Sequence, residues 1–398
     1  MRKYKTLVIS NLYPSAEFPG RGVFTEHRIR NLVKSGRVET RVLCPLPWFP
    51  LRGERFGQYG AFARVGGAGE RHGIAINYPK YPVVPKVGTA LSGLFMALSL
   101  FRAARRQQRN GFEFDVIDAY YFYPDGVAAA LVGKWLRKPV VITAYGSDLN
   151  ILPDHPLVRA QIRWAAAQAA GLTTVCGALK DVLVDLGTPA DKVRVVLHGV
   201  DLALFRPVED RATLRQRLGL SGPVCLSVGN LVELKGHDLT IRAVGSMTEG
   251  VLLIAGDGPE AASLKALVER ERLEDRVRFL GRLSQAELVD YYCAADAFVL
   301  SSSREGIANV IMESMACGTP VVATAVGGAP EVITVPEAGL LVDRRTPEAI
   351  ADAIGRLLAD PPDRAATRRF AEQFTWERTT ADHLAVLDGV ITGTDKPD

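Results

Sequence analysis

Short runs of β-branched and other apolar residues alternate with segments of helical period along nearly the whole chain. Most of the runs are about four to seven residues long, and they lie at 5–10, 40–44, 115–120, 139–145, 171–176, 193–198, 223–230, 251–256, 276–281, 297–301, 319–324 and 338–342. Short apolar strands separated by amphipathic helices are typical of parallel βαβ units with right-handed crossovers. The alternation therefore predicts an α/β protein built on parallel sheets.

Two domains are expected, because 398 residues exceed what one hydrophobic core usually organises. The strands form two successive sets, which indicates two doubly wound sheets. A single eight-stranded barrel fits less well, because loops of the phosphate-binding type occur in two clusters. A strand ends within 198–207, where Pro207 interrupts regular structure. We predict an N-terminal domain over 1–202 and a C-terminal domain over 203–375, with a helix at about 376–392 that completes the first domain.

The net charge of +4 conceals an asymmetry between the two halves. Residues 1–205 carry 27 Lys and Arg against 15 Asp and Glu, whereas residues 206–398 carry 21 against 29. A basic half favours a polyanionic partner, and a solvated basic face with no partner is the alternative. Nucleic acid is disfavoured, because no basic groove interleaved with aromatic residues is evident.

The sequence predicts a cytoplasmic protein. No apolar run reaches the roughly 18 residues of a membrane span, and the N-terminal segment lacks the cleavage site of a signal peptide. The cysteines are scattered without a CxxC pair, which indicates free thiols in a reducing compartment rather than disulfides or zinc ligands: Cys44, Cys176, Cys225, Cys293 and Cys317.

A candidate anion site follows the run at 297–301. A polar loop leads through Gly306 into a predicted helix over 309–316, which Gly318 ends and Pro320 cannot continue. The free N–H groups and dipole of a helix N-terminus suit a diphosphate. Glu305 and Glu313 flank this start, at most roughly 12 Å apart along a helix. Their carboxylates can accept hydrogen bonds from hydroxyl groups at both ends of a nucleotide sugar.

Glu305 and Glu313, with GIANVIM between them, reproduce an E-x7-E motif, and the chain resembles the retaining GT-B glycosyltransferases of family 4. Further blocks resemble that family in order, so the resemblance covers nearly the whole chain: PGRGVFTEHRIRNL, YPDGVAAALVGKWLRKPVVITAYGSDLN, KVRVVLHGVDLALF, SVGNLVELKGHDLTIRAV, LLIAGDGPE and GTPVVATAVGGAPEVI. It implies two Rossmann-like domains facing each other across a cleft, with the acceptor on the N-terminal side and the donor on the C-terminal side.

The resemblance also implies roles for individual residues. Glu305 would bind hydroxyl groups of the donor sugar, Glu313 the ribose, and Lys235 would neutralise the diphosphate as it leaves. The other donor contacts implied are backbone groups at Gly306, Ile307, Ala308 and Asn309, the turn at Gly256, Asp257 and Gly258, and Gly22 in the loop after the first strand.

The donor half departs from the family pattern at Asn230, where an arginine is usual as a second phosphate cation. Arg282 or Arg304 would then substitute. This departure, with those on the acceptor side, keeps open a catalytically weak relative that acts as a binding subunit. A hydrolysing sugar-nucleotide epimerase of similar fold is the other alternative.

The acceptor half departs from the pattern at Tyr120 and Tyr145, where family members often carry histidine. Asp148 follows a strand expected to face the cleft, and we take it as a catalytic candidate; a helix N-cap is its alternative role. The resemblance implies front-face attack with retention of configuration. The chain contains no D-x-D sequence, so we expect no required metal and no cofactor, the nucleotide sugar (by family habit a UDP-sugar) being a substrate.

Segment 87–109 combines an apolar stretch with a basic end at Arg102, Arg105, Arg106 and Arg109. It is too short to span a bilayer, and it suits the surface of an anionic membrane. Acceptors in the resembled family are often lipid-linked, so we expect peripheral contact with the inner face of the cytoplasmic membrane. A buried core helix with a solvated basic end is the alternative.

Overall fold

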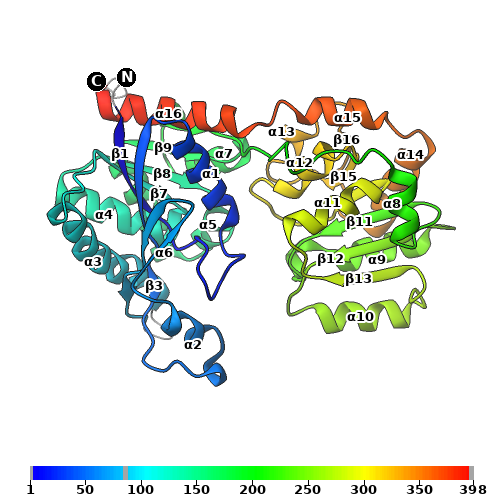
Figure 1. The fold of residues 1–398 in the computed structure, drawn as a ribbon, viewed down its shortest axis with the longest axis horizontal. Helices are drawn as coiled ribbons and strands as arrows, with labels where there is room; N and C mark the ends of the chain where they lie inside the picture. The colour runs from blue at the N-terminus through cyan, green and yellow to red at the C-terminus, as the bar shows by residue number, and fades with distance from the viewer. Residues whose placement is uncertain (1–2, 84–87, 394–398) are drawn as a thin grey trace. The chain divides into compact units, whose positions relative to one another are not determined.

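The structure is a computed structural model that describes residues 3–83 and 88–393, with the side chains of 88–90 excepted. The chain divides into two compact units (Figure 1). Unit 1 contains residues up to Leu197 together with those from Trp376 onward, and unit 2 contains His198–Thr375. Unit 2 is therefore one continuous stretch inserted into unit 1.

Unit 1 is built on an eight-stranded sheet. Its strand order is β10 (Val193–Val195), β9 (Gly171–Thr174), β8 (Val140–Ala144), β7 (Val116–Tyr120), β1 (Tyr4–Ile9), β2 (Val38–Leu43), β5 (Ile74–Asn77) and β4 (Ala68–Arg71). All pairs are parallel except β4 with β5. Central strands such as β7 and β8 are buried along their whole length, as in a parallel sheet covered on both faces.

The helices of unit 1 cover this sheet. They are α1 (Val23–Lys34), α2 (Gly57–Arg64), α3 (Gly88–Arg109), α4 (Val127–Leu136), α5 (Ser147–Asn150), α6 (Pro156–Gln168), α7 (Gly177–Asp185) and α16 (Trp376–Thr392). The C-terminal α16 packs on α1 and β9 and buries Trp376, Leu384 and Leu387. The predicted helix at about 376–392 is thus present and belongs to unit 1.

A buried polar cluster joins α16 to the centre of unit 1. His383 Nδ1 lies 3.2 Å from Arg28 Nη2, and its Nε2 lies 2.9 Å from Asp118 Oδ2. Because arginine only donates, Nδ1 accepts and the ring proton lies on Nε2, which donates to Asp118. Tyr120 donates to the same Asp118 oxygen over 2.7 Å.

Unit 2 is a six-stranded parallel sheet. Its order is β13 (Val277–Gly281), β12 (Val251–Ala255), β11 (Val224–Val228), β14 (Ala297–Leu300), β15 (Val321–Thr324) and β16 (Gly339–Val342). Its helices are α8 (Arg211–Arg217), α9 (His237–Ser246), α10 (Ala261–Arg270), α11 (Gln285–Ala294), α12 (Asn309–Ala316), α13 (Ala329–Val332), α14 (Pro347–Ala359) and α15 (Arg364–Ala371). In the chain order of its strands this is the 3-2-1-4-5-6 arrangement of a doubly wound fold.

All twelve predicted strands are present, and the prediction of two sheets rather than one barrel is confirmed. Two features of unit 1 were not predicted: the hairpin of β4 and β5, and the small pair of β3 (Leu46–Pro47) with β6 (Lys80–Tyr81). The unit boundary lies at Leu197–His198, slightly before the predicted 202/203. The reason is that Val200 bonds to Phe374 and pairs with Thr375 in unit 2.

Two expectations about the chemistry of the chain bear on the fold. The five cysteines are buried, and none forms a disulfide. Across the described ranges, 3–83 and 88–393, no helix is both long and apolar enough to cross a membrane. Residue 87 of the basic segment lies outside the described residues, and the rest of that segment forms α3.

Candidate active site

The strand order of the sheet in unit 2 reverses at its centre. Strands β11 and β14 lie side by side, and the strands that follow each run to opposite edges. In open α/β sheets, ligands bind outside the carboxyl ends of the strands at this switch point. The loops that leave β11 and β14 there are 229–236 and 301–308, and they carry Lys235 and Glu305.

Lys235 and Glu305 form an ion pair across this point. Lys235 Nζ lies 2.5 Å from Glu305 Oε1, and the hydroxyl of Ser302 donates to the same oxygen over 2.6 Å. The two charged side chains are only 19% and 11% exposed, so solvent screens the pair weakly. Sequence reasoning selected both residues separately, and the structure brings them into contact. It did not select Ser302, although this serine precedes the motif in a polar loop.

The N-terminus of α12 faces the same loop without a side-chain cap. Ala308 occupies the N-cap position, and no side chain accepts a hydrogen bond from the first turn. An uncapped first turn is compatible with anion binding, and the anion site itself stays a prediction. Asn309, the first residue of the helix, accepts a hydrogen bond from His198 Nδ1 over 2.8 Å, which fixes the orientation of its amide.

A glycine pair holds the loop before α12 in place. Gly328 donates from its N–H to the carbonyl of Gly306 over 2.6 Å. Gly327 has a φ of +56°, and a Cβ there would collide with the carbonyls of Glu305 and Gly306. These glycines lie in a block that supported the resemblance, but sequence reasoning did not place them at the site.

Glu313 is buried inside unit 2 on α12. Tyr292 donates to its carboxylate over 3.0 Å, and Gln285 donates over 3.3 Å. Burial raises the pKa of Glu313 to about 7, while these two hydrogen bonds oppose the rise. Tyr292 and Gln285 belong to α11, and no spacing in the sequence connects them to Glu313.

The turn at 256–258 depends on its glycines. A Cβ at Gly256 would collide with the carbonyl of Gly229, and one at Gly258 would collide with the carbonyl of Leu231. The loop after β12 can therefore pack directly on the loop after β11. Asp257 is exposed, and its carboxylate accepts from the N–H of Gly258 over 2.8 Å. The predicted tight turn is present, and its contact with a nucleotide base stays a prediction.

The arginines around the two site loops differ in their contacts. Asn230, Arg282 and Arg304 are all exposed. Arg345, which sequence reasoning missed, contacts both site loops: it donates to the carbonyl of Ser301 over 2.8 Å and to that of Glu233 over 3.5 Å. Arg345 is thus an arginine that hydrogen-bonds to both loops.

Unit 1 has an equivalent switch point between β1 and β7. Asn11 follows β1, and its N–H and side-chain amide both donate to Asp125, over 2.5 Å and 2.6 Å. Asp125 is fully buried, and burial raises the pKa of its carboxyl to about 8. Neither residue was predicted, although each is a polar residue just beyond the end of a buried strand.

In unit 1, the predicted site residues mostly contact other parts of the protein. Gly22 has a φ of +67°, and a Cβ there would collide with the backbone of Leu12. Tyr120 is fully buried, and its predicted place on the acceptor side stays a prediction. Tyr145 is 9% exposed and stacks on Tyr120 with ring centres 5.9 Å apart.

Asp148 is also fully buried. Its carboxylate accepts from the backbone N–H groups of Phe122 over 2.7 Å, Gly146 over 2.6 Å and Tyr145 over 3.1 Å. Burial raises the pKa of Asp148, and these three bonds oppose the rise. The carboxylate therefore joins the loops after β7 and β8, and a catalytic role for it stays a prediction.

The arrangement of acidic, histidine and cysteine side chains bears on metal binding. Among the residues that the structure describes, no group of three His, Cys, Asp or Glu side chains is placed to hold a metal ion. Independence from metal remains an expectation from the missing D-x-D sequence.

Comparison with known proteins decides the family. A model described as Glycosyl transferases group 1 matches residues 210–374, and one described as Glycosyltransferase Family 4 matches residues 20–204. The chain belongs to the group 1 glycosyltransferases. This group 1 glycosyltransferase is 41% identical over 303 residues to a D-inositol 3-phosphate glycosyltransferase of Acidothermus cellulolyticus. The matched region covers 69% of this chain and 66%, just under two thirds, of that relative.

Two solved structures show that the group 1 glycosyltransferase has the GT-B fold. Sucrose-phosphate synthase from Thermosynechococcus elongatus matches with a TM-score of 0.80 at 22% identity, over 98% of this chain and all of the other. HepE of Anabaena, solved in complex with UDP, matches with a TM-score of 0.75 at 20% identity, over 98% of this chain and 100% of that one.

Proposed function

We propose that the chain transfers a sugar from a nucleoside-diphosphate sugar, a UDP-sugar first among them, to a glycan or lipid-linked acceptor of cell-envelope or exopolysaccharide biosynthesis. The transfer retains the configuration of the anomeric carbon and needs no metal. The transferred sugar is a hexose or an N-acetylhexosamine. The single observation that carries the proposal is the ion pair of Lys235 and Glu305 at the switch point of unit 2.

The ion pair acts by exchanging partners. Without donor, each charge of the pair compensates the other within a mostly buried contact. A diphosphate brings negative charge to Lys235, and a sugar brings hydroxyl donors to Glu305, so both charges keep a partner when the pair separates. As the bond to the sugar breaks, charge grows on the diphosphate, and Lys235 with the free N–H groups of α12 stabilises it.

Support for a nucleotide donor comes from three sources. The anion site at the start of α12 lies in the loop that carries Glu305, and the turn at 256–258 packs against the loop that carries Lys235. Glu313 offers a buried carboxyl to a ribose hydroxyl. HepE, which shares the fold, is a UDP-bound protein.

Support for a lipid-linked acceptor comes from α3. Leu91, Leu94 and Leu98 point outward on this helix of unit 1, and Arg102, Arg105 and Arg109 continue the exposed face. A buried core helix, the alternative considered from sequence, would not leave three leucines exposed. Peripheral contact at the inner face of the cytoplasmic membrane is therefore part of the proposal.

The test is nucleotide release from a panel of UDP-, GDP- and ADP-sugars in the presence of EDTA. We expect release from one donor class, with a loss of about 100-fold or more in Lys235→Ala and in Glu305→Ala. Lys265→Ala and Glu269→Ala are matched controls, because they remove exposed charges of the same kinds on α10, and they should retain full activity.

The remaining outcomes separate the alternatives. A thermal shift with nucleotide but no turnover, with or without lipid extract as acceptor, would contradict the proposal and identify a binding subunit. Release that needs no acceptor and yields an epimerised sugar would identify a hydrolysing epimerase.

A further inference from the structure

Unit 1 contains a cavity lined by positive charge. It lies between α3 and the segment that joins β5 to β6, and its volume is about 340 Å³. Lys80, Arg102 and Arg106 contribute to its wall, together with the polar side chains of Asn77, Ser99 and Gln107. Among the described residues that line it, none is acidic. Such a wall suits an anion.

The charges of this wall are not compensated within the protein. Arg102 and Arg106 are one turn apart on α3, where like charges repel each other. Over the described parts of the chain, neither makes an ion pair with a carboxylate. Lys80 gives one of its N–H groups to the carbonyl of Phe62 over 2.5 Å, and burial lowers its pKa, with a smaller contribution from Arg52. A bound anion would relieve both effects.

An exposed apolar stripe adjoins this cavity. Leu91, Leu94 and Leu98 are 39%, 42% and 43% exposed, and their spacing of three and four residues places them on one face of α3. The next residue on that face, one turn beyond Leu98, is Arg102 of the cavity wall. Trp135 of α4 is also exposed and packs edge-on against Phe101, with ring centres 5.5 Å apart.

Leucines that lead into arginines along one helix face match the layers of a bilayer surface. Apolar side chains enter the boundary of the acyl chains, tryptophan lies at headgroup level, and arginines meet phosphate. We propose that this cavity binds the headgroup phosphate of an anionic phospholipid while the leucine stripe of α3 enters the bilayer surface. The inference rests on the proposed membrane contact and assigns to it a defined phosphate site.

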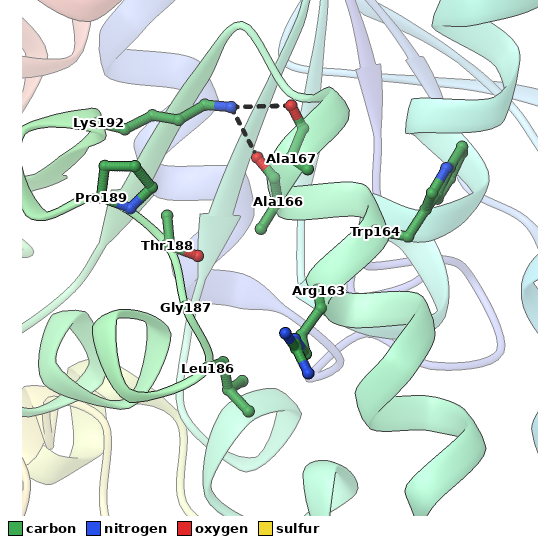
Figure 2. Close-up of a pocket in the computed structure, with 9 residues that line it drawn as sticks. All are labelled: Arg163, Trp164, Ala166, Ala167, Leu186, Gly187, Thr188, Pro189 and Lys192. Atoms are coloured by element: carbon green, nitrogen blue, oxygen red, sulfur yellow. Dashed lines mark hydrogen bonds between the residues drawn. The ribbon is translucent and has the colours of Figure 1, made fainter.

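A second cavity of unit 1 also has two cationic side chains in its wall. It lies between α6 and the loop 186–192, and Arg163 and Lys192 line it (Figure 2). Lys192 Nζ donates to the carbonyls of Ala166 and Ala167 over 2.8 Å and 3.0 Å, as Figure 2 shows. The ammonium group of Lys192 therefore binds the carbonyl groups at the C-terminal end of α6.

Helix α6 supplies a matched control. Arg159 and Arg163 are exposed on α6 at the same four-residue spacing as Arg102 and Arg106. The double variants Arg102→Gln/Arg106→Gln and Arg159→Gln/Arg163→Gln remove equal charge from unit 1. A diffuse attraction to an anionic surface would respond similarly to both, whereas a phosphate site responds only to the first.

The experiment is sedimentation of the full chain with vesicles of phosphatidylcholine, with and without roughly one third phosphatidic acid. We expect binding to the anionic vesicles only, a loss of at least about tenfold in affinity for Arg102→Gln/Arg106→Gln, and less than about twofold for the α6 pair. The triple variant Leu91→Gln/Leu94→Gln/Leu98→Gln should also weaken binding, and thermal unfolding checks that each variant folds.

Equal losses in the two arginine pairs would overturn the phosphate site. So would binding of inorganic phosphate, followed by calorimetry, without any binding to the anionic vesicles, since that would show an anion site for a soluble ligand. Nucleotide release by the wild-type chain is measured without vesicles in the same preparation. Intact release with no vesicle binding therefore counts against membrane contact and this phosphate site but not against sugar transfer, and absent release counts against sugar transfer.

Discussion

At the scale of single residues, the site of unit 2 holds two carboxyl groups in different states. Glu305 is paired with a cation and accepts from Ser302, which stabilises its charged form. Among the described residues, Glu313 has no cationic partner and accepts only from the hydroxyl of Tyr292 and the amide of Gln285. Because its pKa is raised to about 7, Glu313 changes charge near neutral pH. One site thus contains an ion-paired carboxylate and a buried carboxyl whose pKa is raised.

Glu313 should make folding stability depend on pH. Its pKa is about 7 in the folded chain against 4.5 ordinarily, so the folded state binds the proton more tightly. Its contribution to the free energy of unfolding is therefore greatest below about pH 4.5 and declines as the pH rises to about 7, by about 3 kcal/mol at most. In Glu313→Gln this decline should disappear.

Urea unfolding of both proteins between pH 5 and pH 8 measures the difference. Glu274→Gln, an exposed change in the same unit, is the control and should keep the wild-type pH profile. An identical profile for Glu313→Gln and wild type would show that this carboxyl does not titrate in the folded chain over that range.

At the scale of elements, the donor site depends on loops packed backbone against backbone. Gly256 and Gly258 bring the loop after β12 onto the loop after β11, and Gly327 brings another turn onto the loop before α12. Each contact leaves no room for a Cβ atom. These loops can pack closely because the glycines carry no side chain. This packing positions the polar groups of the site.

Gly256→Ala should destabilise unit 2 by about 3 kcal/mol or more, because the new methyl group collides with the carbonyl of Gly229 and φ is +150°. Gly219→Ala is the matched control: its φ is +61° but nothing lies within 4 Å of the new methyl group, so about 1 kcal/mol is expected. Chemical unfolding with a probe in unit 2 compares them, and equal losses would mean that the collision is relieved by a small shift of the loop.

Elements also show where prediction from the sequence succeeds. Most of the twelve predicted strands are at least four residues long and buried over most of their length, which gives an apolar run; β10, with three residues of which two are exposed, is the exception in length. Strand β4 is mostly exposed, and β3 and β6 contain two residues each, so none of these leaves such a run. The same reason applies to the site. Lys235, Glu305 and Glu313 carry a motif, whereas Ser302, Tyr292 and Arg345 are selected only by contacts that tertiary packing creates.

At the scale of the whole molecule, unit 1 depends on both ends of the chain. Helix α16 supplies His383, which bridges Arg28 and Asp118 in a fully buried cluster. Removing the imidazole leaves two buried charges without their common partner. The stability of the first unit is therefore set in part by residues that follow the second unit in sequence.

His383→Ala should destabilise unit 1 by about 3 kcal/mol. Hydrogen exchange followed by mass spectrometry should show lost protection in α1 and β7, with unit 2 unchanged. His155→Ala is the control, since His155 is exposed just before α6 in the same unit. Uniform loss of protection across both units would mean that they unfold together, which would contradict the division into two independent units.

The insertion of unit 2 has a consequence for how the chain is made. Thr375, the last residue of unit 2, is synthesised before α16, on which α1 and the cluster around His383 depend. Domains generally fold as units, and the N-terminal one usually folds first during synthesis. Here the unit that begins first is completed last, because synthesis of unit 1 ends only after the whole of unit 2 has been made.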